Sequence, residues 1–401
     1  MHRRDILTAI GATALSGSAF AAAPALNPAL PPGVLDTATL ERLPDKQPLI
    51  KLTYRPPNYE TPLDAFRTPI TANDRFFVRY HLANIPDMDR LRKDFTLKIG
   101  GDAAGKLLTL TMEDLHKLPT TEVTAVCQCA GNRRGFSNPH VPGVQWGSGA
   151  MGNAIWSGVR LKDVLAKAGV KPGALEIGLA GADGPVLETT PAFRKSLPLE
   201  KAMDDNVIIA FAMNHQPLPH YNGYPIRLIV PGWTATYWMK HLTQLDIRSK
   251  PLDSFWMQKS YRVPRGLFAV DQPFASQEAP ETSAITEIVV NSLITNLADG
   301  TKLPAGGSII QGIAWDRGHG IKSAEVSLDG GANWRNATLG GDLGRYAFRQ
   351  FSLDTGKLSP GKLTILARAT SNAGEMQAEQ LKLNPAGYQN NVPMPVSVTV
   401  T

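Results

Sequence analysis

A cysteine, a turn of small residues and two arginines follow one another in the segment 126–134, Val-Cys-Gln-Cys-Ala-Gly-Asn-Arg-Arg. A thiolate beside fixed positive charge stays deprotonated and can then ligate a metal. The turn Ala-Gly-Asn permits a positive φ and lets the backbone approach a large ligand closely. Arginine side chains offer planar, permanently charged forks that match the oxygens of an oxyanion. The segment therefore indicates a thiolate-bound metal that acts on an oxyanion.

The two cysteines of the chain, Cys127 and Cys129, leave other interpretations open. A disulfide between them would be strained, because residues i and i+2 point to opposite faces of a strand. A zinc site needs two further ligands nearby, and the sequence contains no Cys-x-x-Cys pair. Spacing alone favours two inert buried cysteines.

The run from Cys129 to Arg134, Cys-Ala-Gly-Asn-Arg-Arg, resembles the molybdenum-ligating motif of the sulfite oxidase family. Further matches extend from about Phe76 to about Asn384, and they are closest to bacterial periplasmic sulfite dehydrogenases. The resemblance implies that Cys129 ligates molybdenum, which also carries the dithiolene sulfurs of molybdopterin, and that Cys127 is a structural residue. It also implies that Arg134 binds the substrate.

Three other segments resemble parts of the family's substrate pocket. In Phe77-Val78-Arg79-Tyr80-His81 the resemblance assigns Arg79 to the substrate, and Phe77 and His81 to the cofactor. In Gly143-Val-Gln-Trp146 and Trp256-Met-Gln-Lys-Ser-Tyr261 it assigns Trp146 and Tyr261 to the substrate pocket. A lone tryptophan or tyrosine is otherwise more often part of a core.

The remaining predicted cofactor contacts also come from the resemblance. Asp183 follows a glycine-rich loop, although an ordinary turn aspartate is an equally good interpretation. Arg227 matches an arginine that binds the cofactor phosphate, and Asn222 stands where animal members carry a histidine. Trp238, Met239 and Lys240 match a segment that holds the pterin.

Composition excludes several classes of protein. With 43% hydrophobic and 19% charged residues, the 401-residue chain is typical of globular proteins with two or three domains. The net charge of +6 is spread without long basic runs, which argues against nucleic-acid binding. A small anionic substrate or an acidic protein partner suits this charge better.

The beginning of the chain has the features of an export signal. Arg3 and Arg4 precede an apolar run over residues 6–23, and Ala19-Phe20-Ala21 resembles a cleavage site. We therefore predict a twin-arginine signal peptide over residues 1–21, a periplasmic protein, and no membrane attachment after cleavage. Residues 22–44, rich in proline and alanine, are predicted to form an extended arm rather than a packed element.

The rest of the chain is predicted to have an α+β fold with two domains. The first, over residues 45–270, is a sulfite-oxidase-type molybdopterin-binding domain by resemblance, and the second, over 275–401, is an immunoglobulin-like β-sandwich by strand spacing. A strand is predicted over 73–82, and a turn into an amphipathic helix over 156–165. In the second domain, strands are predicted over 285–291, 309–315, 323–328, 346–353 and 363–369.

The expected function is that of a sulfite dehydrogenase that oxidises sulfite to sulfate. No Cys-x-x-Cys-His haem motif is present, so we expect electrons to pass to a separate c-type cytochrome, within a homodimer or a complex with that cytochrome. Alternatives are an oxotransferase for sulfane or sulfoxide substrates, an oxygen-reducing sulfite oxidase, and a non-enzymatic protein with a degenerate cofactor domain. The segment 384–387 matches a family segment that carries a substrate arginine, which Arg349 could replace.

Overall fold

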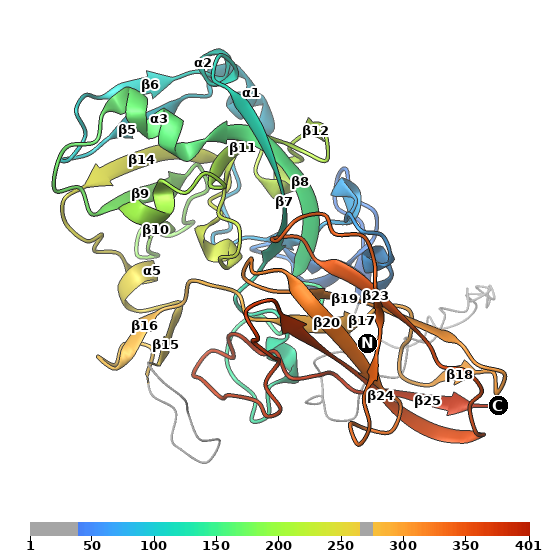
Figure 1. The fold of residues 1–401 in the computed structure, drawn as a ribbon. Helices are drawn as coiled ribbons and strands as arrows, with labels where there is room; N and C mark the ends of the chain where they lie inside the picture. Colours follow the sequence, from blue (N-terminus) through green and yellow to red (C-terminus); the bar gives the residue numbers. More distant parts are fainter. Residues whose placement is uncertain (1–38, 265–275) are drawn as a thin grey trace, which may run out of the picture.

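The computed structural model describes residues 39–264 and 276–401, so the predicted signal peptide lies outside the described residues. Within this part the chain forms a larger α+β unit, followed by a β-sandwich (Figure 1). The predicted fold class is confirmed. No helix in the described residues is long and apolar enough to cross a membrane.

Two five-stranded sheets build the first unit. The strands of one sheet are, in spatial order, β10 (Arg194–Pro198), β9 (Glu176–Gly181), β14 (Leu242–Arg248), β5 (Leu97–Gly100) and β6 (Leu108–Leu110). The other sheet contains β12 (Gln216–Pro217), β11 (Ile208–Met213), β8 (Met151–Arg160) and β7 (Thr120–Gln128), with β13 (Arg227–Ile229) paired to β11. The motif that contains Cys129 begins at the end of β7.

Helices in this unit are short, as the many glycines and prolines indicate. They are α1 (Met88–Asp94), α2 (Met112–His116), α3 (Leu161–Ala168), α4 (Leu199–Ala202) and α5 (Phe255–Gln258). Thr111 caps α2 in a reciprocal capping box with Asp114, as its sequence predicts. The predicted amphipathic helix is α3, but the residues just before it belong to β8 and not to a turn.

The two longest strands of the first unit, β7 and β8, form an antiparallel pair that runs from the larger unit to the sandwich (Figure 1). Cys127 lies opposite Gly152 in this register. A Cβ at Gly152 would approach the ring of Phe76 to 2.4 Å, so only glycine leaves room for that ring. Because β7 leads into the cysteine motif, this strand pair connects the motif to both units.

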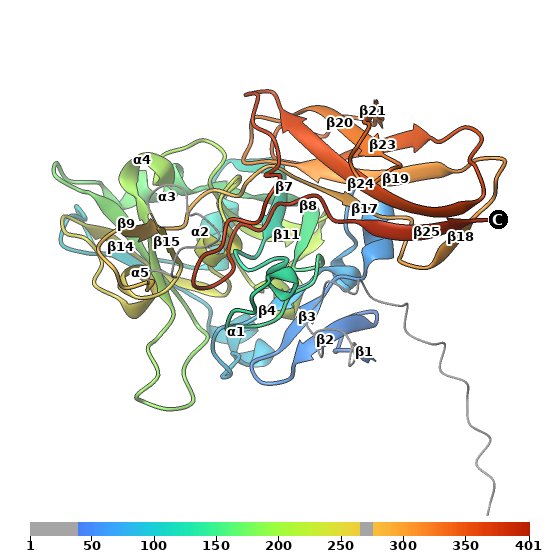
Figure 2. The same ribbon diagram turned by 90° about the horizontal axis from the view of Figure 1, so that it is seen from below.

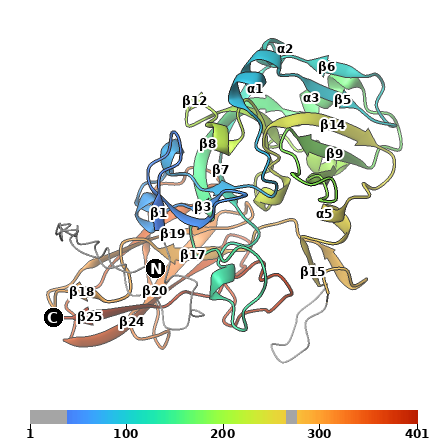
Figure 3. The ribbon, with the colours of Figure 1, turned by 180° about the vertical axis from the view of Figure 1, so that it is seen from behind.

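A small N-terminal sheet lies beside the junction of the two units (Figure 3). It contains β1 (Thr39–Glu41), β2 (Leu49–Thr53), β3 (Asn58–Glu60) and β4 (Val78–Arg79). The prediction of an unpacked arm up to residue 44 is wrong for its last residues, because β1 pairs with β2 and Leu43 is buried.

The strand predicted over residues 73–82 is much shorter than expected. Residues 73–75 form a 3-10 turn, and only Val78 and Arg79 pair, with β3. The aromatic residues of this segment are buried because they pack around a cavity and into the adjacent core, not because they belong to a long strand.

The second unit is a sandwich of a four-stranded and a five-stranded sheet. The first sheet contains β17 (Asn291–Ile294), β19 (Ile309–Trp315), β23 (Arg349–Asp354) and β22 (Thr338–Leu339). The second contains β18 (Thr301–Leu303), β25 (Val396–Val400), β24 (Gly361–Ser371), β20 (Ile321–Ser327) and β21 (Arg335–Asn336). The two sheets enclose an aliphatic core.

The prediction of a strand over residues 285–291 is wrong. A hairpin of β15 (Arg262–Pro264) and β16 (Thr282–Ala284) ends just before it, and β17 begins only at Asn291. Ile285, Ile288 and Val290 are buried where the chain crosses the junction of the units. Ile285 packs in the first core, and Ile288 packs with Trp315 in a cluster that both units share.

The sandwich contacts the cysteine motif directly. Val126 donates its backbone N–H to the carbonyl of Tyr346 (2.9 Å), and Trp315 Nε1 donates to Gln128 Oε1 (2.5 Å). Seen from below, the segment that precedes β25 reaches over the first unit (Figure 2). It brings Gln389 N within 3.4 Å of the carbonyl of Ala130.

Candidate active site

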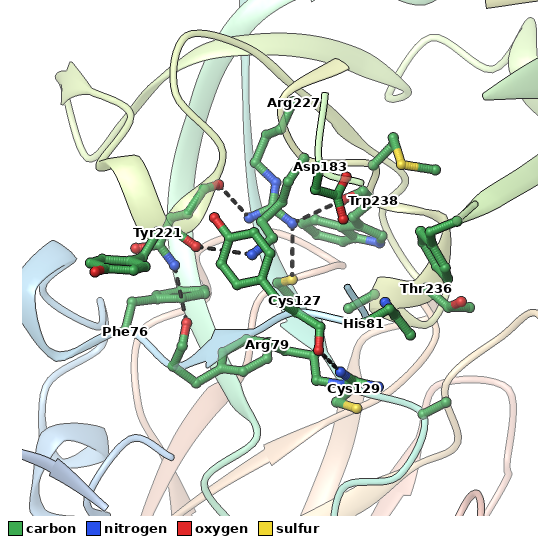
Figure 4. Close-up of a pocket in the computed structure, with 18 of the residues that line it drawn as sticks. Phe76, Arg79, His81, Cys127, Cys129, Asp183, Tyr221, Arg227, Thr236 and Trp238 are labelled. Carbon is green, nitrogen blue, oxygen red and sulfur yellow. Dashed lines mark hydrogen bonds between the residues drawn. The ribbon is translucent and has the colours of Figure 1, made fainter. Parts of the chain in front are cut away.

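A cavity lies where the end of β7, the segment 76–81 and the segment 235–240 meet (Figure 4). Most of the predicted site residues line it, although they are far apart in sequence. These residues are Phe77, Arg79, His81, Cys129, Asp183, Asn222, Arg227, Trp238, Met239, Lys240 and Tyr261.

Both cysteines line the cavity, and both are free thiols. Strand alternation would place them on opposite faces, but β7 ends at Gln128 and Cys129 already lies in the following turn. That turn is held by hydrogen bonds from Cys129 N to the carbonyl of Ala150 (2.9 Å) and from Asn132 N to the carbonyl of Cys129 (3.0 Å).

Cys127 differs from Cys129 in its surroundings. Burial raises the pKa of the Cys127 thiol to about 11, although Arg227 opposes this with its charge. Arg227 Nη2 lies 3.7 Å from Cys127 Sγ. The neutral thiol is therefore the expected form of Cys127, as suits a structural residue.

Arg79, His81 and Tyr261 meet at one edge of the cavity. Arg79 Nη2 lies 3.5 Å from the hydroxyl oxygen of Tyr261, and His81 Nε2 makes a short hydrogen bond with the same oxygen. Burial, followed by the charges of Arg79, Lys240 and Lys195, holds the pKa of His81 well below its usual value. A neutral imidazole and a permanent cation thus face the cavity together.

Tyr261 adopts an uncommon backbone conformation, with a φ of 58°. Arg133 (φ 68°), after Cys129, and His241 (φ 48°), after the segment 235–240, share this left-handed region of backbone conformation. Non-glycine residues in this region cost conformational energy and concentrate at functional sites. The three residues come from separate segments that all border the cavity.

Cations gather at the opposite end of the cavity. Arg227 donates to the carbonyls of Asn222 (2.9 Å) and Trp238 (3.1 Å), and Lys240 donates to that of Tyr221 (3.1 Å). Burial first, and then Arg227, lowers the pKa of Lys240 well below its usual value, while Asp183 opposes the shift. A buried arginine and a buried lysine beside a single carboxylate favour a ligand with an anionic group at this end.

Several polar atoms of the lining have no hydrogen-bond partner among the described residues. They are Arg79 Nε, Arg227 Nε and Thr236 Oγ1. Buried polar groups are rarely left unpaired in native proteins. A bound group rich in hydrogen-bond acceptors fits this lining.

Two predicted site residues do not line the cavity. Arg134 Nε donates to the carbonyl of Ala386 (2.6 Å), and Nη1 donates to that of Val144 (3.0 Å). Its guanidinium also packs against glycine, because a Cβ at Gly131 would lie 2.6 Å from Arg134 Cζ. Trp146 is fully buried in the core, and its Nε1 has no partner among the described residues. Neither side chain lines the cavity, and their predicted substrate roles stay predictions.

The first arginine of the motif has a structural role. Arg133 is fully buried and donates to the carbonyls of Ser292 and Val392, both in the second unit. Asn390 Nδ2 donates to the carbonyl of Arg133 in return (3.1 Å). In sequence the two adjacent arginines resemble an anion-binding pair, but the side chain of Arg133 connects the two units.

The second unit contributes an aromatic residue that our sequence analysis missed. The ring of Tyr388 stacks on that of Tyr261, with centroids 5.4 Å apart, and Arg134 Cζ lies 5.3 Å from the Tyr388 centroid. Tyr388 directly follows the segment 384–387 that matches the family's substrate segment, which was the available signal. Arg349, the suggested replacement arginine, instead donates to the carbonyls of Gly340 and Ile321.

Comparison with known proteins agrees with this site. Residues 82–256 match the family model of the oxidoreductase molybdopterin binding domain, and residues 282–401 match that of the Mo-co oxidoreductase dimerisation domain. The chain belongs to the sulfite oxidase family of molybdenum enzymes. The cofactor of this family member is therefore molybdenum-molybdopterin. In the cavity, Cys129 would be its thiolate ligand, and Arg227 and Lys240 would bind its phosphate.

Relatives support the same assignment. The chain is 35% identical over 308 residues to mitochondrial sulfite oxidase of Rattus norvegicus, and this match covers 75% of the chain but only 55% of the rat protein. It is 28% identical to sulfite oxidase of Arabidopsis thaliana, covering 88% of the chain and 93% of that protein. The sulfane dehydrogenase SoxCD of Paracoccus pantotrophus superposes with a TM-score of 0.73 at 28% identity, covering 93% of this chain and 92% of that one.

Among the described residues, no group of three or more His, Cys, Asp or Glu side chains could enclose a metal ion. The roles assigned to individual residues stay predictions until variants are measured.

Proposed function

We propose that this member of the sulfite oxidase family is a sulfite dehydrogenase. The observation that carries the proposal is the meeting of Arg79, His81 and Tyr261 on one edge of the cavity that Cys129 also lines. Sulfite and water give sulfate, two protons and two electrons. A pyramidal dianion needs a permanent cation and neutral hydrogen-bonding groups in one partly dry place, and this edge supplies them.

Each of the three side chains has a definite task in this proposal. Arg79 binds sulfite oxygens through charge-assisted hydrogen bonds, and Tyr261 offers its hydroxyl to a neighbouring oxygen. His81 stays neutral, because the nearby cations and burial disfavour its protonation, and it orients that hydroxyl. The bound molybdenum cofactor supplies the oxygen-transfer and two-electron redox chemistry, while these residues orient the substrate.

The electron acceptor, the location and the assembly complete the proposal. We infer that a separate c-type cytochrome takes the electrons one at a time, and that the protein reaches the periplasm by the twin-arginine route through Arg3 and Arg4. The match of residues 282–401 to a dimerisation domain supports a homodimer, and the similarity to SoxCD supports a complex with a partner protein.

A sulfane substrate is the second candidate, because the similarity to a sulfane dehydrogenase covers nearly the whole chain. The two candidates differ in what the substrate presents. Sulfite is compact, and its reacting sulfur carries three charged oxygens, whereas a sulfane sulfur is bonded to another sulfur and carries no oxygens of its own. The buried edge formed by Arg79 and Tyr261 favours the compact dianion.

The test is a set of steady-state assays on protein of known molybdenum content. Sulfite and thiosulfate are compared as substrates, with cytochrome c and with oxygen as electron acceptors, and a sulfoxide is tested with a reduced dye as electron donor, because its reduction consumes two electrons. We expect cytochrome c reduction with sulfite and much slower reaction with the others. Turnover with thiosulfate but not sulfite would refute the proposal. Export of Arg3→Lys/Arg4→Lys at the normal level would refute the twin-arginine route separately.

A further inference from the structure

Strand β3 lies directly behind the proposed substrate arginine. All three of its residues are buried, and two of them are polar: Asn58, with 1% of its surface exposed, and Glu60, with 4%. Because strand side chains alternate, Asn58 and Glu60 share one face, while Tyr59 points to the other and donates its hydroxyl to Glu41 Oε1 (2.7 Å).

The side-chain amide of Asn58 is locked in one orientation. Its Nδ2 donates to Thr53 Oγ1 (2.6 Å) and to the carbonyl of Pro56 (3.1 Å). The carbonyl of Pro56 can only accept, and the Thr53 hydroxyl already donates to it, so the nitrogen lies on that side and the oxygen faces the other way. There, Asn58 Oδ1 accepts hydrogen bonds from Arg79 Nη1 and from Tyr80 N, each at 3.2 Å.

These contacts orient Arg79 without neutralising it. Arg79 forms no ion pair among the described residues; besides Asn58 it contacts the carbonyl of Tyr80 and the hydroxyl of Tyr261. A carboxylate at position 58 would hold the guanidinium equally well, but it would also compete with an anionic substrate for its charge. An amide oxygen fixes the direction of the fork and leaves its full charge for the substrate.

We propose that Asn58 is a positioning residue that aims Arg79 at the substrate oxyanion while preserving the charge of the guanidinium. The proposal rests on the proposed role of Arg79 in binding sulfite. Asn58 itself does not line the cavity, so it acts through Arg79 and makes no contact with the substrate.

Two variants of Asn58 test the two parts of this proposal in enzyme with wild-type molybdenum content. Asn58→Ala removes the acceptor, and we expect the KM for sulfite to rise about tenfold, as for the loss of a hydrogen bond to a charged group. Asn58→Asp keeps the acceptor but adds a charge, and we expect its KM to rise as well. Asn58→Asp also loses the two hydrogen bonds that Nδ2 donates, so its melting temperature is measured beside the KM. An unchanged KM in Asn58→Asp contradicts the charge argument.

Tyr59→Phe is the matched control, because it removes a buried hydrogen bond on the opposite face of the same strand. We expect it to leave the KM for sulfite unchanged, even if it lowers the melting temperature. A rise in KM equal to that of Asn58→Ala would mean that β3 acts through general stability, and the proposal would be overturned.

A double-mutant cycle with Arg79→Gln separates this proposal from the proposed function. If Asn58 acts through Arg79, Asn58→Ala should change the KM less than twofold in the Arg79→Gln background. A rise in KM for Arg79→Gln, but none for Asn58→Ala, would overturn the positioning role and leave the proposed function intact. If neither variant changed the KM, Arg79 would be removed from the substrate site and the proposal would be overturned with it.

Discussion

Arg79 and His81, two residues apart, both contact the hydroxyl oxygen of Tyr261, which lies 180 residues further along the chain from His81. The segment that carries them leaves β4 at Arg79, so this pairing depends on the local turn of the chain and not on a long strand. Tyr261, in its left-handed conformation, contacts both side chains at the same edge of the cavity. A variant at any of the three should therefore affect the other two.

Arg79→Gln keeps a hydrogen-bond donor but removes the charge. A charge-assisted contact contributes about 1.5–3 kcal/mol, so the KM for sulfite should rise about 10- to 100-fold, provided that it tracks binding. Molybdenum content should stay near that of the wild type, because Cys129, Arg227 and Lys240 lie elsewhere in the cavity. Arg75→Gln is the control, since Arg75 pairs with Asp64 at the surface (2.7 Å) and should leave the KM unchanged.

Cys129→Ser should abolish turnover, whereas Cys127→Ser should keep most of it. Both thiols line the cavity, but only Cys129 stands in the ligand motif, while burial raises the pKa of Cys127 to about 11 and disfavours its thiolate. Steady-state assays on both variants, corrected for bound molybdenum and pterin, provide the measurement. Equal behaviour of the two folded and loaded variants would show that the ligand is assigned wrongly.

Arg133→Met should loosen the attachment of the sandwich to the cysteine motif. The variant leaves the carbonyls of Ser292 and Val392 without their donor, and hydrogen bonds to charged groups contribute about 1.5–3 kcal/mol each. We expect a loss of about 3 kcal/mol, measured as a lower urea midpoint. Arg160→Met, which removes a half-exposed ion pair with Asp205, should cost less than about 1 kcal/mol. Equal losses would contradict the role of Arg133 between the units.

Glu60 should make the folded protein less stable as the pH rises from about 5 to about 8. Burial raises its pKa to about 7 from the usual 4.5, although the backbone N–H groups of Gly147 and Gly149 oppose the shift. Between these values the folded protein holds a proton that the unfolded chain has released, so the contribution of Glu60 to stability falls as the pH rises through this window.

Glu60→Gln cannot titrate, and this isolates the effect. Relative to the wild type, the free energy of unfolding of the variant should improve by about 2–3 kcal/mol between pH 5 and pH 8. The variant also loses one acceptor for the loop at Gly147 and Gly149, but that cost does not change with pH. Denaturation curves at both pH values measure the difference. A difference that stays constant or moves in the opposite direction would rule out a titrating Glu60.

Linear motifs predicted the composition of the cavity well, because each short segment carries its own geometry. Phe77, Arg79 and His81 lie on one segment, and Trp238, Met239 and Lys240 on another, so recognising one residue places its neighbours. Cys129 reaches the cavity because it lies in the turn after β7. These features depend on local sequence.

Features that the sequence did not predict depend on contacts between distant segments. Arg133 and Arg134 resemble an anion-binding pair until the carbonyls of Ser292 and Ala386, more than 150 residues away, are placed beside them. The segment before Asn291 resembles a strand, although Ile285 and Ile288 are buried in two different clusters at the junction of the units. Sequence periodicity records that a residue is buried, but it does not record which surface buries it.

The most direct test of sulfite oxidation at this site is a single turnover without an electron acceptor. Purified protein of known molybdenum content is mixed anaerobically with excess sulfite, and the sulfate formed is measured by ion chromatography. The sulfite dehydrogenase proposed here should form about one sulfate per molybdenum, and the Cys129→Ser variant should form none. Failure of the loaded wild-type protein to form sulfate would contradict the assignment of sulfite as the substrate.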